Sequence, residues 1–162
     1  MTAEYQAGYK LRDLKQFIEE TVGPRIAQRL ECEMSKVSLE LTTKSTGHGF
    51  DMLVQHYEAE FYFDKFPFTK YDPAVLFSNV AAWLMDNDGE REYDDDLLDP
   101  EVEVTTEDET NAEILINVAF KEPIKVIEDP EGLIHWRGKR WSVQQYDVHV
   151  ATNLLSVTAK SA

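Results

Sequence analysis

A chain of 162 residues with 43% hydrophobic and 11% aromatic content is long enough for one folded domain and too short for two independent ones. Its formal charge of −15 is local, because residues 86–113 contain fourteen acidic residues and one basic residue. Since nucleic-acid binding needs a basic stripe that neutralises phosphates, the charge pattern disfavours that class of function.

Two helices are predicted at the start of the chain. Apolar residues recur every three to four positions in 9–22, which predicts a helix with one apolar face that ends at Gly23 and Pro24. Pro24 fits the first turn of a following helix, so residues 24–34 are also predicted to be helical. Its buried side would consist of Ile26, Ala27, Leu30 and Met34.

Alternating polarity then predicts two strands. In residues 36–43, Val37, Leu39 and Leu41 alternate with polar residues, which is the pattern of a half-buried strand. The turn-rich segment 44–50 is predicted to be a mobile loop. A second strand is predicted over 53–66. One face of that strand would carry Tyr57, Ala59, Phe61 and Phe63.

The clearest helix signal covers residues 73–88. Asp72 is suited to the N-cap and Pro73 to the first helical position. The apolar face of this helix is predicted to pack on a sheet. It would consist of Leu76, Val80, Trp83 and Leu84.

Three further strands are predicted in 99–106, 111–129 and 132–138, and a type I turn at 129–132 would join the last two. Pro123 interrupts the longest apolar run and indicates a bend, a bulge or an edge position. From residue 139 the alternation is weaker and then disappears. The residues that carry it are Trp141, Val143, Tyr146, Val148 and Val150.

These elements predict an α+β fold, in which a mixed, mainly antiparallel sheet of about four to five strands is packed by two or three helices. Residues 1–137 would form a single domain, and 138–162 a C-terminal extension or arm. No signal peptide, membrane-spanning run or lipidation motif is recognisable, which predicts a protein made in the cytoplasm without membrane contact. Cys32 has no second cysteine to pair with, and a buried thiol is expected.

The acidic stretch that follows the second long helix raises the question of a metal site. An EF-hand register that places Gly89 at position six puts Asp86 and Asp88 at positions three and five, but it puts the core-facing Leu84 at position one. Consecutive solvated acids also do not resemble the separated carboxylate pair of a glycosidase. The stretch is therefore interpreted as a solvated connection and a candidate electrostatic face. Its residues are Asp86, Asp88, Glu90, Glu92, Asp94, Asp95, Asp96 and Asp99.

No other catalytic or cofactor signature is present in the sequence. The four histidines have no ligand-like spacing, and neither a GxSxG elbow nor a P-loop occurs. We predict no metal, no cofactor and no enzymatic activity.

One basic cluster, at residues 135–141, combines cations with tryptophans. It could in principle stack single-stranded nucleic acid, or it could simply be a hairpin tip. A contact with another subunit or a protein partner is preferred, because Trp and Arg dominate interface energies and the cluster would complement an acidic loop. The candidate contact residues are Trp136, Arg137, Lys139, Arg140 and Trp141.

The order of elements resembles the R-type tail completion proteins of contractile-tailed phages. The likeness lies in YEAEFYFDKF at 57–66, in the helix PAVLFSNVAAWLMDND with its Trp-Leu end at 73–88, and in the strand, turn, strand and acidic turn of 101–136. It covers about residues 9–137. The sequence differs from the family pattern in a longer N-terminal helical region, in its acidity at 86–113 and in the arm after Gly138.

The resemblance implies a tail-terminator-like protein that caps the head-proximal end of a phage tail. Such a protein would form a homo-hexameric ring and contact the tail tube protein, the tail sheath protein and the head–tail connector or neck proteins. DNA would pass through its bore without specific binding. Its location would be the virion tail, after assembly in the host cytoplasm.

Two other hypotheses remain open from the sequence. The first is a monomeric acidic module that recruits a basic partner through residues 86–113. The second is a divalent-metal-dependent enzyme that uses some of the same carboxylates.

Overall fold

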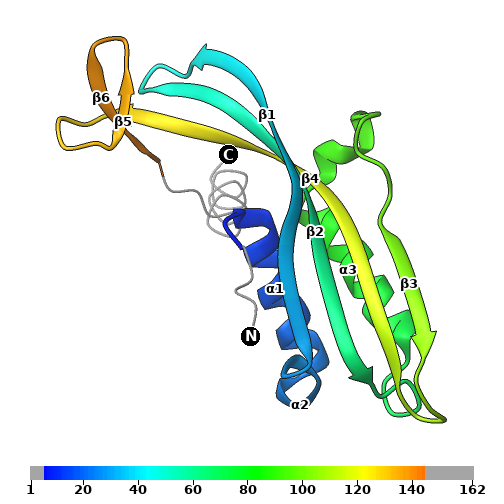
Figure 1. Cartoon of the computed structure of the whole chain (residues 1–162). Coiled ribbons are helices and arrows are strands. Elements are labelled where there is room, and N and C mark those ends of the chain that lie inside the picture. Colours follow the sequence, from blue (N-terminus) through cyan, green and yellow to red (C-terminus); the bar gives the residue numbers. More distant parts are fainter. Residues whose placement is uncertain (1–5, 145–162) are drawn as a thin grey trace, which may run out of the picture.

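The structure, a computed structural model, describes residues 6–144. A long, curved antiparallel sheet wraps around helices that pack on one of its faces (Figure 1). The helices are α1 (Tyr9–Val22), α2 (Pro24–Ala27), α3 (Pro73–Asn87) and the short 3₁₀ helix η1 (Gly89–Tyr93). The strands are β1 (Leu30–Ser45), β2 (Phe50–Phe66), β3 (Glu101–Thr106), β4 (Ala112–Glu128), β5 (Ile134–Trp136) and β6 (Lys139–Val143).

The sheet has the order β1-β2-β4-β6-β5, and β3 also pairs with β4. Strands β3 and β6 share one edge of β4, with β3 along residues 112–117 and β6 along 126–128. Within the described part of the chain, residues 118–125 therefore have a strand partner on one side only, and Pro123 lies in this stretch. Proline has no backbone N–H to donate to a neighbouring strand, which is why it occurs at such edge positions. The α+β, mainly antiparallel prediction is confirmed.

The helix-facing side of the sheet forms the core. Tyr57, Ala59, Phe61 and Phe63 of β2 are buried there, as the period-two pattern predicts. Helix α3 begins as expected, because Asp72 accepts a hydrogen bond from Ala74 N at 2.9 Å and Pro73 occupies the first turn. The predicted apolar face of α3 is also confirmed, since all four of its residues are buried. The other contributions come from α1 and β4: Leu11, Leu14, Ile18, Ile114, Ile116, Val118 and Phe120.

The predicted helix over 24–34 is wrong beyond Ala27. From Leu30 the chain is β1, in which Cys32 and Met34 are buried opposite Phe61 and Ala59 of β2. Glu31 and Glu33 alternate with them on the other side. Burial against β2 thus determines the conformation, although the local sequence is also compatible with a helix.

The later part of β1 differs from the prediction in its burial. Val37, Leu39 and Leu41 are strand residues, but they are 44%, 59% and 79% exposed. A register shift between Ser35 and Ser38 separates them from the buried start of the strand. The described residues therefore leave uncovered this part of the strand that was expected to be half-buried.

The turn at 129–132 forms as predicted, with Gly132 N donating to Asp129 O at 2.9 Å. The strands on either side of it do not pair with each other, because β6 lies between β4 and β5. Residues 139–143 of the predicted C-terminal extension are thus part of the sheet. The candidate strand residues Tyr146, Val148 and Val150 lie outside the described residues.

Candidate interaction surfaces

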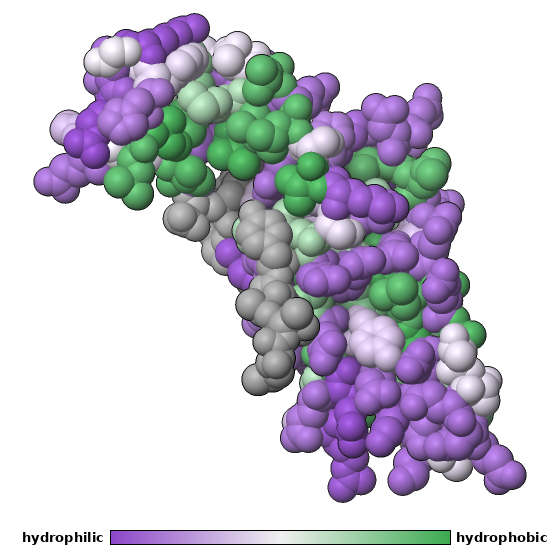
Figure 2. All heavy atoms as spheres, in the orientation of Figure 1, coloured by the Kyte–Doolittle hydropathy of each residue, from purple (hydrophilic) through white to green (hydrophobic). Residues whose placement is uncertain are grey.

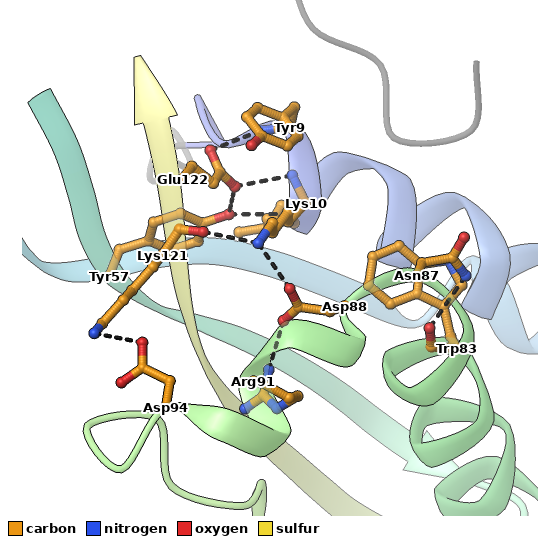
Figure 3. Close-up of polar contacts among 11 residues, drawn as sticks. Tyr9, Lys10, Tyr57, Trp83, Asn87, Asp88, Arg91, Asp94, Lys121 and Glu122 are labelled. Atoms are coloured by element: carbon orange, nitrogen blue, oxygen red, sulfur yellow. Dashed lines mark hydrogen bonds and ion pairs between the residues drawn. The ribbon is translucent and has the colours of Figure 1, made fainter. Parts of the chain in front are cut away.

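A buried polar network joins the N-terminus of α1 to β4 and to the acidic segment (Figure 3). Glu122 on β4 is fully buried and accepts hydrogen bonds from the backbone N–H groups of Tyr9 and Lys10, at 3.2 and 2.9 Å. The Tyr57 hydroxyl donates to the same carboxylate, and Gln55 Nε2 donates to it at 3.1 Å. A carboxylate at the unsatisfied amides of a helix start is favoured both by the hydrogen bonds and by the helix dipole.

Tyr57 is the neutral partner in this network. Burial raises the pKa of its hydroxyl far above the usual range, and the charge and hydrogen bond of Glu122 raise it further. The hydroxyl also accepts a hydrogen bond from Leu11 N at 3.1 Å. The proton therefore stays on Tyr57, where it holds the Glu122 carboxylate in place.

The network continues through Lys10 into the acidic segment. Lys10 Nζ donates to Asp88 Oδ1 at 2.7 Å and to the Lys121 carbonyl at 2.8 Å. Arg91 Nη1 donates to the other oxygen of Asp88 at 2.8 Å. Asp88 is only 5% exposed. Of the eight acids of the predicted electrostatic face, it is therefore the one that the structure places inside the protein.

The remaining seven acids of that face lie on the surface. Asp94 and Asp96 accept from Lys121 Nζ at 2.6 and 3.3 Å, and hydrogen bonds from Lys121 and from Asp96 N lower the pKa of Asp94. The same pairing raises the pKa of Lys121. The others are exposed and have no ion-pair partner among residues 6–144: Asp86, Glu90, Glu92, Asp95 and Asp99.

The acidic segment does not form a calcium-type loop. Leu84 is buried in the core, and α3 continues through Asn87, so the oxygens of Asp86 and Asp88 do not converge on one centre with those of Asp95. In the described part of the chain, three carboxylates elsewhere have oxygens within 4.8 Å of one another, those of Asp64, Glu107 and Glu113. They are side chains of an acidic surface, and Lys65 N already donates to Glu107 at 2.9 Å.

The basic and aromatic residues gather at the β5–β6 hairpin. Trp136 and Trp141 pack edge-on against Phe50, with ring centroids 4.9 and 5.6 Å away. The guanidinium of Arg137 lies over the Trp136 ring, 4.3 Å from its centroid. Trp141 is buried, so it supports the hairpin and is not available for contact.

The three cations of this hairpin are exposed. Arg140 Nε donates to the Gly132 carbonyl at 2.7 Å, and Lys139 Nζ lies 3.5 Å from Glu128 Oε2. Arg137 is at the turn itself, in a left-handed conformation with φ 53°, beside Gly138 with φ 71°. The hairpin therefore presents Arg137 and Lys139 outward, with Trp136 half-buried beneath them.

A projecting part of the sheet carries this hairpin. We define the arm as residues 37–56 and 123–143, which extend beyond the helices towards the upper left of Figure 1. Cross-strand partners lie on the same side of a sheet, and the pairs Leu41–Leu53 and Leu53–Ile124 continue the helix-facing side into the arm. Figure 2 shows apolar side chains gathered along this inner side. The apolar arm face consists of Leu39, Leu41, Phe50, Leu53, Ile124 and Val143.

Comparison with known proteins identifies the family. A family model described as the P2 phage tail completion protein R (GpR) matches residues 8–145. The chain belongs to this family. It is accordingly a structural phage tail protein, in agreement with the resemblance seen in the sequence.

A protein of Haemophilus phage HP1 (strain HP1c1), described as an uncharacterized 19.2 kDa protein in the rep-hol intergenic region, is 26% identical over 109 residues. The alignment covers 67% of the chain and 65% of the phage HP1 protein, so the chain spans just under two thirds of that relative. No solved structure matches the chain. Among the residues described, no helix is long and apolar enough to span a membrane.

The GpR match includes α1, α2 and β6. The N-terminal helices and β6, the first strand of the predicted C-terminal extension, therefore lie within the region that the family model matches. The sequence had suggested that both depart from the family pattern. The acidic segment lies within the matched region as well.

Sequence reasoning missed the Lys10, Tyr57 and Glu122 network. One signal was present, because Glu122 follows Phe120 at the spacing of a strand face whose other members are apolar. A lone carboxylate on such a face needs buried donors. These donors come in part from α1, which is more than a hundred residues distant in the sequence.

Proposed function

We propose that this GpR-family protein is a non-catalytic component that caps the head-proximal end of a phage tail. It would stop polymerisation of the tube and sheath and help to join the tail to the head connector. Six copies would form a ring, through which DNA passes without specific binding. The family supports the tail role, and the surfaces of the chain support assembly with other copies.

The observation that carries the proposal is the apolar arm face. Leu41 is 79% exposed, Leu39 59% and Val143 50%, and none of the described residues covers them. Contiguous apolar side chains on one exposed face are typical of a protein–protein interface. A second copy of the chain is the occupant that a ring requires.

The outer edge of β1 supports the same conclusion. This strand has 16 residues and pairs with β2 alone among the strands described. Such an edge exposes backbone donors and acceptors that another chain can pair with, and soluble proteins usually protect it. Burial between copies would protect it.

The exposed acids give the ring a charged surface. If they face the bore, they repel DNA and let it slide; if they face outward, they meet basic surfaces of the sheath or the connector. Both arrangements need the acids on the surface, where all but Asp88 lie.

The self-association proposal is tested by native mass spectrometry and light scattering of the purified protein. We expect the wild type to form a closed oligomer, and Leu41→Glu to reduce it to monomers, since an acid on the arm face would be buried unpaired. Leu41 makes little contact with the other described residues, as its 79% exposure shows, so the variant should remain folded. The matched control is Val75→Glu, which also adds an acid at an exposed apolar position, in the first turn of α3.

The tail role is tested by electron microscopy of tails assembled with and without the protein. Its loss should give overlong or head-free tails. Tails of normal length that carry heads would contradict the capping role. A strictly monomeric wild type that does not bind tubes would contradict the ring.

A monomeric acidic module is the second candidate. The exposed acids that have no ion-pair partner among residues 6–144 favour it. In that case, replacing several acids of residues 86–99 by amides should abolish binding of a basic partner, while tail length stays normal.

A further inference from the structure

A groove lies between α3, the segment 89–100 and β3, on the opposite side of the molecule from the β5–β6 hairpin (Figure 1). Its volume is about 910 Å³, and its floor contains Val80, Leu84 and the β4 residue Ile116. Arg91 closes one side, but its guanidinium is already bonded to Asp88 and to the Leu98 carbonyl. The groove is therefore apolar at its base.

The walls of the groove expose large apolar side chains. Met85 is 72% exposed and Leu98 is 70% exposed, and Val102 of β3 lies beside them at 39%. Nothing in the described residues covers these three side chains. Together they offer an apolar contact area that a partner could bury.

The rim of the groove is acidic. Glu92, Asp95 and Asp99 line it, all are exposed, and no cation among the described residues pairs with any of them. An occupant therefore needs an apolar part for the base and positive charge for the rim. A nucleic acid or an acidic peptide would be repelled.

The same chain carries a surface of that chemistry at its other side. The tip of the β5–β6 hairpin presents Arg137 and Lys139 outward, with the partly exposed ring of Trp136 beneath them. Trp and Arg are the residue types that most often carry the energy of protein interfaces. Leu133, which is 86% exposed, adds an apolar side chain near the same hairpin.

We propose that the β5–β6 hairpin of one copy docks into the α3–β3 groove of the next copy. The two surfaces differ and lie on different parts of the chain, so the contact is head-to-tail, and repetition produces either a ring or an open helical filament. The inference rests on the proposed function only in its requirement for self-association. It adds a second contact between copies, beside the one that the apolar arm face makes.

Charge reversal on each surface tests the docking. The hairpin variant is Arg137→Glu with Lys139→Glu, and the groove variant is Asp95→Lys with Asp99→Lys. All four side chains are exposed, so both proteins should fold, which circular dichroism checks. Each variant alone should self-associate at least tenfold more weakly than the wild type, because like charges then face each other.

The two variants mixed in equal amounts should associate again. Acidic hairpins then meet basic grooves, and wild-type hairpins meet wild-type grooves, so every contact regains opposite charges. Combining all four substitutions in one chain should restore association as well. Sedimentation equilibrium measures the dissociation constants. Glu20→Lys with Glu109→Lys, at two exposed positions outside both surfaces, is the charge control for the groove variant, because it raises the net charge by the same four units.

The outcomes separate this inference from the proposed function. A wild type that stays monomeric contradicts the ring itself. A wild type that assembles, while both variants assemble equally well, leaves the ring standing and overturns the docking of hairpin and groove. Loss of association in the variants without recovery on mixing also overturns it, since the two surfaces would then have different partners.

Discussion

At the scale of single residues, Asp88 is the acid with a structural role. It lies between Lys10 of α1 and Arg91 of η1, and so it fixes the start of the acidic segment to the first helix. Asp86, two residues earlier, is exposed and has no ion-pair partner in the described region. The two positions form a matched pair within one charged stretch.

We expect Asp88→Ala to lower the free energy of unfolding by about 3 kcal/mol, because it leaves two largely buried cations without their common partner. Asp86→Ala should change the same quantity by less than about 0.5 kcal/mol, as is usual for an exposed position. Urea denaturation of both variants measures the difference. Equal stabilities would contradict the assigned role of Asp88.

Because Tyr57 is protonated in the folded state, the free energy of unfolding should depend on pH in the alkaline range. Its pKa is raised in the folded state, so the contribution is complete below the unfolded value of about 10 and is lost as the pH rises above it. The free energy of unfolding should then fall by about 1.4 kcal/mol per pH unit for this group.

Urea denaturation between pH 9 and 11 measures this slope. Tyr57→Phe should reduce this slope by about 1.4 kcal/mol per pH unit, the contribution of one proton. Tyr93→Phe, at a position that is 86% exposed, serves as the control. An unchanged slope in Tyr57→Phe would show that another group causes the alkaline loss.

At the scale of elements, α3 is defined by local signals at its start. Asp72 caps the helix and Pro73 occupies its first turn, and the chain needs no distant partner for either. The apolar face from Leu76 to Leu84 then packs the helix on the sheet.

Asp72→Ala should therefore destabilise the protein by about 1 kcal/mol through loss of the cap. Asp72→Asn keeps an oxygen acceptor at the same position and should remain close to the wild type. Thermal unfolding followed by circular dichroism distinguishes the two. If the asparagine variant were as unstable as the alanine variant, the charge and not the cap would be responsible.

Strand β1 illustrates how one element can have two environments. Its first residues pair with the core part of β2, where Cys32 and Met34 are buried. Its later residues pair with the part of β2 that no described helix covers. The pairing is continuous apart from two register shifts. Burial along the strand therefore depends on where the helices end, and not on the strand itself.

At the scale of the whole molecule, the sheet is longer than the described helices that cover it. Residues 57–63 of β2 face α1 and α3, while residues 37–45 of β1 and 50–56 of β2 extend into the arm. A helix-covered region and an uncovered one should differ in local stability.

Hydrogen–deuterium exchange should detect this difference. In dilute protein, amides of 37–45 and 50–56 should exchange faster than those of 57–63, because fewer buried contacts oppose local opening. At concentrations that favour self-association, the arm amides should become protected while those of 57–63 change little. Exchange that is independent of concentration would contradict burial of the arm between copies.

Elements with local signals could be predicted from the sequence. The amphipathic spacing of 9–22, the Asp-Pro start of α3 and the alternation in 57–63 each specify one face, and the structure confirms all three. The resemblance seen in the sequence also indicated the family, and the family match over residues 8–145 confirms it.

The contacts that those faces make depend on the tertiary structure. Pairing with β2 made residues 30–34 a strand, the place of β6 between β4 and β5 separated the predicted hairpin, and α1 supplied the donors for Glu122. The same holds for Leu41, whose pattern predicts burial but which no described helix covers. Periodicity records which side of an element is apolar, whereas burial depends on neighbours that are distant in the sequence.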